Sequence, residues 1–251
     1  MELAEVLRTR RMVRTFDPDR AVPVDIVDRA LHAATRAPSA GFSQGWDFVV
    51  LTDAADRATF WAAATPHPPD PPDPPDPPQR GGNTSPAAPQ PDRWLRGVSA
   101  APCLVVCCSD PQRYYRRYAE PDKSARPATS AAADPWPIPY WDVDTGMAAL
   151  LMLLTGVDAG LGGLFFGVPA ARIGTVAQAL SIPADRRIVG VVALGYPLPD
   201  VRSPSLRRGR RPLAQVAHFG RFGVAWERPT SASTTSGVAH NAAAMPVTPI
   251  T

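Results

Sequence analysis

Three short apolar segments limit what this chain can fold into. They cover residues 46–51 (WDFVVL), 103–108 (CLVVCC) and 188–194 (IVGVVAL), and each has the few charges typical of a buried strand. Between and around them, helical patterns occupy residues 2–8, 25–36, 53–64, 94–99, 111–119, 144–159 and 170–180. No helix or strand is assigned to residues 161–168, which are glycine-rich. Buried strands separated by helices imply a layered α/β or α+β core.

Proline is concentrated in one segment of the chain. The sequence has 31 prolines in 251 residues, and 12 of them lie in residues 66–91. Such a run cannot join a helix or a sheet, because its backbone has few donors and a fixed φ. We therefore predict one domain over residues 1–226 with a disordered insertion at 66–91. Residues 227–251, rich in Ser, Thr, Ala and Pro, are predicted to be a disordered tail.

The Pro-Asp repeat inside that insertion has two interpretations. It is either a docking segment for a proline-recognising partner or a solvated spacer. The Asp at every third position favours the spacer.

Composition and charge exclude several classes of protein. The 26 Lys and Arg residues nearly balance 23 Asp and Glu residues, so a nucleic-acid binder with a concentrated cationic face has little support. The start, MELAEVLRTRR, lacks the apolar stretch of a signal peptide, and the longest apolar stretch, 147–154, is far short of a membrane span. Cys103, Cys107 and Cys108 fit no metal site. We expect a cytoplasmic protein that binds neither nucleic acid nor membrane.

The helix predicted at residues 144–159 is apolar almost all round. In a domain of this size, such a helix indicates that a partner subunit covers part of it.

Common catalytic motifs are missing from the sequence. It has no GxxxxGK[ST] loop, no GxGxxG after a strand, no GxSxG and no HExxH, and its four histidines offer little material for a triad or a zinc site. What remains is arginine near both ends, at residues 10–14 and 207–211. Forked guanidinium donors bind phosphate well, so the two clusters either converge on one anion or are solvated surface charge.

A second candidate for binding is the turn at residues 38–46 (PSAGFSQGW). Its small residues, hydroxyl and amide would let the backbone approach a flat ligand. The alternative is an ordinary connection between a helix and a strand.

Four sequence blocks, in order, resemble the nitroreductase family of flavin enzymes. They are RRMVRTFDPDRAVP; APSAGFSQGWDFVVLTD; GLGGLFFGVP after the long helix; and IPADRRIVGVVALGYP followed by RRGRRPLAQV. The resemblance covers nearly all of residues 2–222 apart from the proline-rich insertion. It implies an α+β three-layer sandwich with a central, mostly antiparallel sheet, in an intertwined homodimer that holds FMN at its interface.

The resemblance also implies which residues bind the cofactor, and it implies no metal and no catalytic side chain. One arginine cluster would hold the phosphate and polar edge of the flavin, the later pair would grip the phosphate, the turn would reach FMN from the other subunit, and a third stretch would pack on the ring. These residues are Arg10, Arg11, Met12 and Arg14; Arg208 and Arg210; Pro38, Ser39, Ala40 and Gln44; and Phe165, Phe166 and Gly167. Met12 stands where a Ser is common in the family.

The expected activity is hydride transfer from NADH or NADPH, through FMN, to an electron-poor small molecule such as a nitroaromatic, a quinone or an activated alkene. Trp136, Tyr140 and Trp141 would either line the substrate slot or pack in the core. Phe42 stands where many members have Asn, and the SAGFSQ sequence is more like the oxygen-dependent 5,6-dimethylbenzimidazole synthases, which fragment FMN. That activity, and a non-enzymatic flavin or deazaflavin carrier, are the alternatives.

Overall fold

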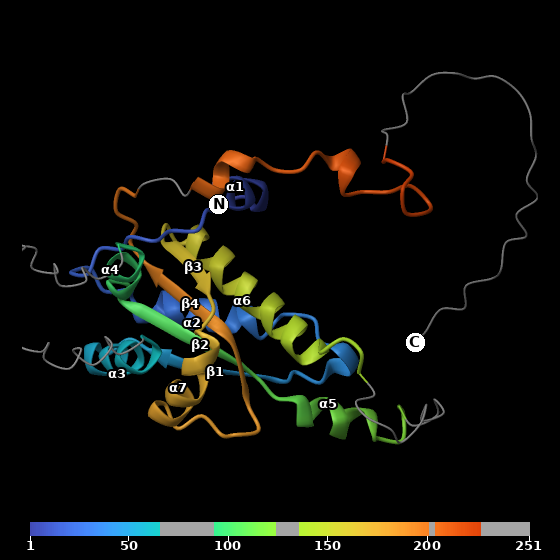
Figure 1. Ribbon diagram of the computed structural model, residues 1–251, viewed down its shortest axis with the longest axis horizontal. Helices are drawn as coiled ribbons and strands as arrows, with labels where there is room; N and C mark the ends of the chain where they lie inside the picture. The colour runs from blue at the N-terminus through green and yellow to red at the C-terminus, as the bar shows by residue number, and fades with distance from the viewer. Residues whose placement is uncertain (66–92, 124–135, 201–203, 227–251) are drawn as a thin grey trace, which may run out of the picture. The chain divides into compact units, whose positions relative to one another are not determined.

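The computed structural model describes residues 1–65, 93–123, 136–200 and 204–226 (Figure 1). The predicted insertion at 66–91 and the predicted tail at 227–251 lie outside these residues. The chain divides into two compact units, Met1–Val201 and Arg202–Thr251, and each is described by itself.

A four-stranded antiparallel sheet forms the centre of the first unit. The strands are β1 (Trp46–Leu51), β2 (Cys103–Ser109), β3 (Gly162–Phe166) and β4 (Arg187–Gly195), in the order β1-β2-β4-β3. Strand β2 pairs with both neighbours, with Val105 opposite Val50 of β1 and Val192 of β4. The predicted α+β class with a central antiparallel sheet is confirmed.

Helices account for most of the remaining described residues of this unit. They are α1 (Leu3–Thr9), α2 (Val24–Ala34), α3 (Ala54–Ala64), α4 (Arg93–Ser99), α5 (Pro111–Tyr118), α6 (Tyr140–Asp158) and α7 (Ile173–Ala179), with short 3-10 turns at Ala40–Phe42 and Ala170–Arg172. Some of their boundaries follow directly from the sequence. Asp53 caps α3 by accepting the N–H of Ala55, and Asp110 caps α5 by accepting the N–H of Arg113.

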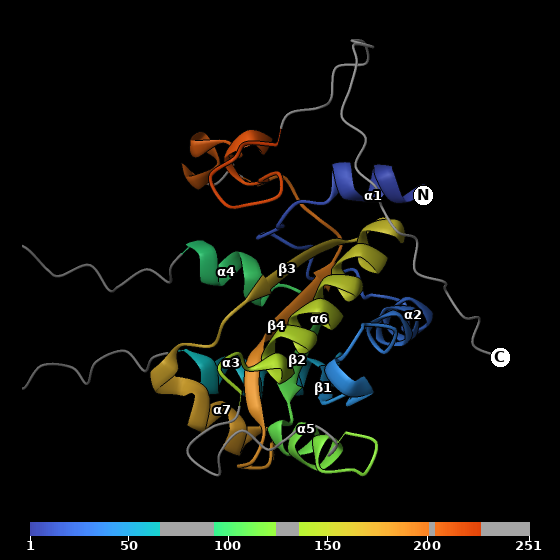
Figure 2. The ribbon, with the colours of Figure 1, turned by 90° about the vertical axis from the view of Figure 1, so that its right-hand side faces the viewer.

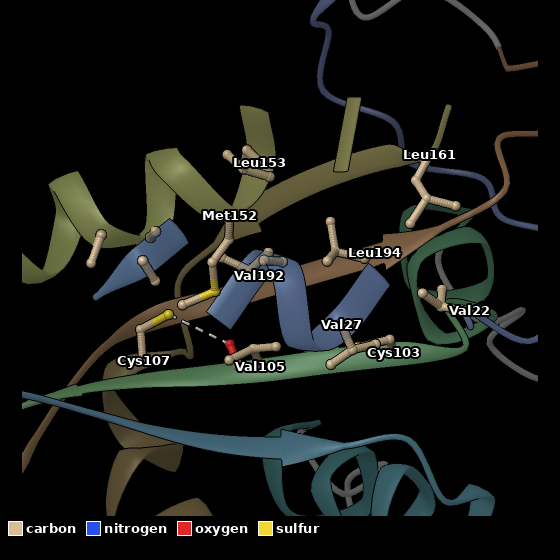
Figure 3. Close-up of a cluster of buried hydrophobic side chains, with 14 of the residues drawn as sticks. Val22, Val27, Cys103, Val105, Cys107, Met152, Leu153, Leu161, Val192 and Leu194 are labelled. Carbon is tan, nitrogen blue, oxygen red and sulfur yellow. Dashed lines mark hydrogen bonds between the residues drawn. The ribbon is translucent and has the colours of Figure 1, made fainter. Parts of the chain in front are cut away.

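The sheet is covered on both faces, which gives three layers (Figures 1 and 2). Because strand residues alternate, Cys103, Val105 and Cys107 of β2 pack toward α2 and α6, as Figure 3 shows. Leu104 and Val106 pack on the opposite face, in a core with residues of α3, α4 and α7. Burial on both faces explains why β2 is a continuous apolar run without alternation.

Most predicted elements are found with their ends shifted by one to three residues, and two differ more. Helix α6 begins at Tyr140, four residues before the predicted start. The glycine-rich stretch contains β3, to which no strand was assigned. A Cβ on Gly162 would lie 2.7 Å from Cγ2 of Val13, so the close approach of that segment explains a glycine where a strand former would be expected.

One face of α6 is buried and another is not. Ala148, Ala149 and Met152 are buried in the core, while Val143 and Leu150 are 43% and 47% exposed. The predicted partner subunit therefore stays a prediction, and this exposed face is where it would lie. Among the described helices, none is long and apolar enough to cross a membrane.

The second unit is described over residues 204–226. It contains 3-10 turns at Pro204–Arg208 and Leu213–Gln215, and a bridge between His218 and Ala225 closes a tight turn.

Candidate functional site

The first arginine cluster lies on a segment that leaves α1 and runs beside β3. The N–H of Val13 donates to the carbonyl of Gly163 at 3.0 Å, and the N–H of Asp17 donates to the carbonyl of Tyr196 at 2.9 Å. Val13 and Phe16 are buried and anchor the segment. Arg11 and Met12 are exposed beside these anchors, and Arg10 and Arg14 are half-buried.

These three arginines have no acidic partner among the described residues. Within the described ranges, the Arg14 side chain makes one hydrogen bond, a long one of 3.4 Å from Nη1 to the carbonyl of Met12. Other arginines of the same unit are paired, such as Arg29 with Asp158 at 3.1 Å and Arg186 with Asp47 at 2.7 Å. Unpaired guanidinium groups on an anchored segment suit an anionic ligand such as a phosphate.

The turn at residues 38–44 is a compact loop with internal hydrogen bonds. The Ser39 hydroxyl accepts the N–H of Gln44 at 3.0 Å, and the Ser43 hydroxyl donates to the carbonyl of Ala40 at 2.7 Å. Pro38 is exposed, and Ser39, Ala40 and Gln44 are half-buried. The loop therefore offers small side chains and backbone in a defined shape, as expected.

Residues that sequence reasoning missed hold this loop in place. Asp144 of α6, 2% exposed, accepts the N–H of Ala40 at 2.8 Å and the hydroxyl of Tyr114 at 2.7 Å. Burial, followed by the bond to Asp144, raises the pKa of Tyr114 well above its usual value, so its hydroxyl stays a donor. The sequence signal was weak, because Asp144 is one of three aspartates in the largely apolar α6.

The loop and the arginine segment lie at opposite ends of α6. The loop contacts Asp144, near the start of the helix, while the arginine segment pairs with β3, which follows its end. With a rise of about 1.5 Å per residue, Asp144 and the end of α6 are roughly 20 Å apart. One chain therefore does not bring the two predicted parts of the site together around one small ligand.

The aromatic pair of β3 points to opposite faces of the sheet. Phe165 packs against the core on the α2 and α6 side. Phe166 stacks on Trp61 of α3, with centroids 5.6 Å apart and planes at 8°, and meets Trp94 edge-on at 5.7 Å. Gly167 is exposed. Both side chains have packing partners within the chain.

The remaining predicted residues fall into two groups. Arg208 and Arg210 are exposed in the second unit, so their meeting with the first arginine cluster stays a prediction. Trp136, Tyr140 and Trp141 form an aromatic cluster with Tyr114, where Trp136 lies 5.7–6.3 Å from the other rings. Within the described residues, no cluster of His, Cys, Asp and Glu could hold a metal ion.

Comparison with known proteins gives a consistent result. The model of the Nitroreductase family matches residues 7–196. A curated protein of Archaeoglobus fulgidus, provisionally named an NADH dehydrogenase/NAD(P)H nitroreductase, is 26% identical over 198 residues, which is 78% of this chain and 86% of that protein.

Solved structures share the fold at lower identity. A provisionally assigned nitroreductase from Desulfovibrio desulfuricans, crystallised in complex with FMN, has a TM-score of 0.59 at 20% identity and covers 88% of this chain and 98% of its own. Nitroreductase A from Vibrio parahaemolyticus has a TM-score of 0.60 at 21% identity, over 88% of this chain and 76% of its own.

Proposed function

The chain belongs to the nitroreductase family, and we propose that it is an FMN-dependent oxidoreductase that takes hydride from NADH or NADPH and reduces an electron-poor small molecule. Nitroaromatics, quinones and activated alkenes are the substrate classes that fit this chemistry. The observation that carries the proposal is a set of guanidinium groups, at Arg10, Arg11 and Arg14, that have no carboxylate partner in the described part of the chain and lie inside the segment that the family model matches.

Those guanidinium groups fit the phosphate and the polar edge of a flavin. They lie on a segment fixed by Val13 and Phe16, so binding would order little additional backbone. The resemblance adds Arg208 and Arg210, which also have no carboxylate partner among the described residues. Bound FMN would supply a ring that accepts hydride and passes electrons on, while the cationic groups would stabilise its anionic reduced form.

The separation along α6 supports a site shared by two chains. Because the loop at 38–44 contacts α6 near its start and the arginine segment lies beyond its end, roughly 20 Å along the helix, we propose that a single flavin contacts one of them from each subunit. A homodimer is part of the proposal for this reason, and the exposed face of α6 around Leu150 is the surface that the partner would cover.

The test begins with the purified protein. We expect a yellow preparation whose flavin absorbance NADH or NADPH bleaches, and reoxidation when a quinone or nitroaromatic is added. A colourless protein that takes up no added FMN would refute the proposal. Oxygen-dependent consumption of reduced FMN with release of a benzimidazole would favour the flavin-fragmenting alternative. Bound flavin that no nicotinamide reduces would favour a carrier.

Substitution of the arginines tests the phosphate contact. Because a hydrogen bond to a charged group contributes about 1.5–3 kcal/mol, we expect Arg11→Ala and Arg14→Ala each to raise the dissociation constant for FMN roughly 10- to 100-fold. The matched control is Arg8→Ala, since Arg8 lies on α1 and faces Glu5 at 3.8 Å. Fluorescence titration of FMN into flavin-free protein measures the change. Equal effects from Arg8 and Arg11 would argue against a specific contact.

A further inference from the structure

The loop at residues 38–44 has a strained backbone. Gly41, Phe42 and Gln44 have φ values of +62°, +56° and +50°. Glycine adopts this region readily, but Phe42 and Gln44 do not. Such a conformation persists only where the surrounding structure holds it.

One external anchor of the loop comes from α6. The buried carboxylate of Asp144 accepts the N–H of Ala40 at 2.8 Å, two residues before Phe42. The same oxygen accepts the Tyr114 hydroxyl at 2.7 Å, which ties the anchor to α5. A buried carboxylate with two donors is a strong acceptor, because its charge is not shared with water.

The other external anchor comes from α5. Nε of Arg117 donates to the carbonyl of Gly41 at 2.8 Å. Its guanidinium is oriented by a bidentate pair with Asp122, 2.7 Å for each bond, and by Glu120 at 3.0 Å. The loop is thus held from two helices at two peptide groups, 39–40 and 41–42, once as a donor and once as an acceptor.

Rings of α5 fill the space behind the loop. A Cβ on Gly41 would lie 2.7 Å from the Tyr118 ring, so that ring packs directly against the loop backbone. Neither Asp144 nor Arg117 belongs to the loop or to the arginine segment. Both act on it from outside.

We propose that Asp144 and Arg117 are positioning residues that hold the loop at 38–44 in the strained conformation in which it meets the flavin. The inference rests on the proposed function, because the loop's contact with FMN is part of that proposal. Loss of either anchor would let the loop relax, and binding of FMN would then have to restore the strained shape.

The test compares each anchor with a matched control on the same helix. Asp144→Ala is paired with Asp142→Ala, since Asp142 also has two polar partners, Ser109 at 2.6 Å and Arg187 at 3.1 Å, outside the loop. Arg117→Gln is paired with Arg116→Gln, because Arg116 faces Asp110 at 3.6 Å. Arg117→Lys keeps one donor and should restore part of the effect.

Three measurements are made on each full-length variant. Hydrogen–deuterium exchange of the flavin-free protein reports the loop directly, in a peptide covering residues 38–46. Titration with FMN gives the dissociation constant, and thermal unfolding reports global stability. We expect the anchor variants to exchange at least tenfold faster in that peptide and to bind FMN at least tenfold more weakly, while both controls stay within twofold of the unsubstituted protein.

Several results would overturn the inference. One is faster exchange with unchanged FMN affinity. Another is that the control variants bind FMN more weakly, in proportion to the thermal stability that each control loses. If Asp144→Ala fails to fold, the comparison of Arg117→Gln with Arg116→Gln decides between the outcomes, because Arg117 is only half-buried. If the unsubstituted protein binds no FMN, the proposed function fails, and the exchange data still decide whether the anchors hold the loop.

Discussion

The thiols of Cys103, Cys107 and Cys108 lie in a strand that is covered on both faces. Burial raises their pKa values to about 11, 12 and 11, because a thiolate would lose its hydration. Each thiol therefore lies in the environment of a small apolar residue. None of the three has the exposed, electropositive surroundings of a reactive cysteine.

The buried thiols predict a loss of stability in alkaline solution. Unfolded thiols ionise near pH 9, whereas the folded ones stay protonated until about pH 11. The stabilisation is complete below pH 9 and falls as the pH rises through this window. The five tyrosines and the single lysine, Lys123, also titrate in this range, so the comparison with Cys107→Ala isolates the contribution of one thiol. We expect the urea midpoint to fall between pH 9 and 11, with a shallower slope in Cys107→Ala. Equal slopes would contradict the assignment.

Phe166 has a packing role that does not require a cofactor. Its stack on Trp61 and its contact with Trp94 are made within one chain. We expect Phe166→Ala to lower the free energy of unfolding of flavin-free protein by about 3 kcal/mol, and Phe166→Leu to lower it by less than half as much. Chemical denaturation without FMN measures both. A loss seen only with FMN bound would assign the ring to the flavin instead.

Among the elements, α4 packs directly against the backbone of the first arginine cluster. A Cβ on Gly97 of this helix would overlap the carbonyl oxygen of Arg14. Only a glycine lets α4 approach the segment so closely. The contact links a helix near residue 97 to a candidate phosphate-binding group near the start of the chain.

This contact predicts the effect of a single methyl group. Gly97→Ala should displace the segment, lower stability by roughly 1–3 kcal/mol and weaken FMN binding. Gly174→Ala is the control, because a Cβ on Gly174 of α7 would meet nothing within 4 Å. Unfolding and FMN titration of the two variants give the comparison. Similar changes in stability and FMN affinity for both variants would show that the contact of α4 with the arginine segment does not affect the site.

The local sequence pattern predicts most of the helices and strands, but not all of them. The three apolar segments predicted β1, β2 and β4 almost to the residue, because burial on both faces leaves a continuous apolar run. Strand β3 was missed, because the close approach of Val13 requires glycine at Gly162 and removes the strand signal. The start of α6 was missed because Pro139, directly before Tyr140, continues an irregular, proline-rich stretch.

For the whole molecule, the proposed homodimer predicts the mass in solution and a substitution that should separate the two subunits. Light scattering should give twice the 26.8 kDa chain mass, with one FMN per chain. Leu150→Arg places a charge on the exposed face of α6, which the partner would bury, so we expect monomers that lose FMN. Ile173→Arg, on α7 at the other face of the sheet, should leave the mass unchanged. A dimer that tolerates Leu150→Arg would place the interface elsewhere.

The sequence by itself determined three of the four described strands, most helices, the family and the residue types proposed to hold a flavin, because each of these leaves a local pattern. The tertiary structure alone decided that Asp144 accepts a hydrogen bond from Ala40, 104 positions away, and that the arginine segment lies beside β3. It also decided that the loop and this segment lie at opposite ends of α6. Such contacts join residues far apart in the chain, and the local sequence around one residue does not indicate its partner. They form only once the sheet and its helices have packed.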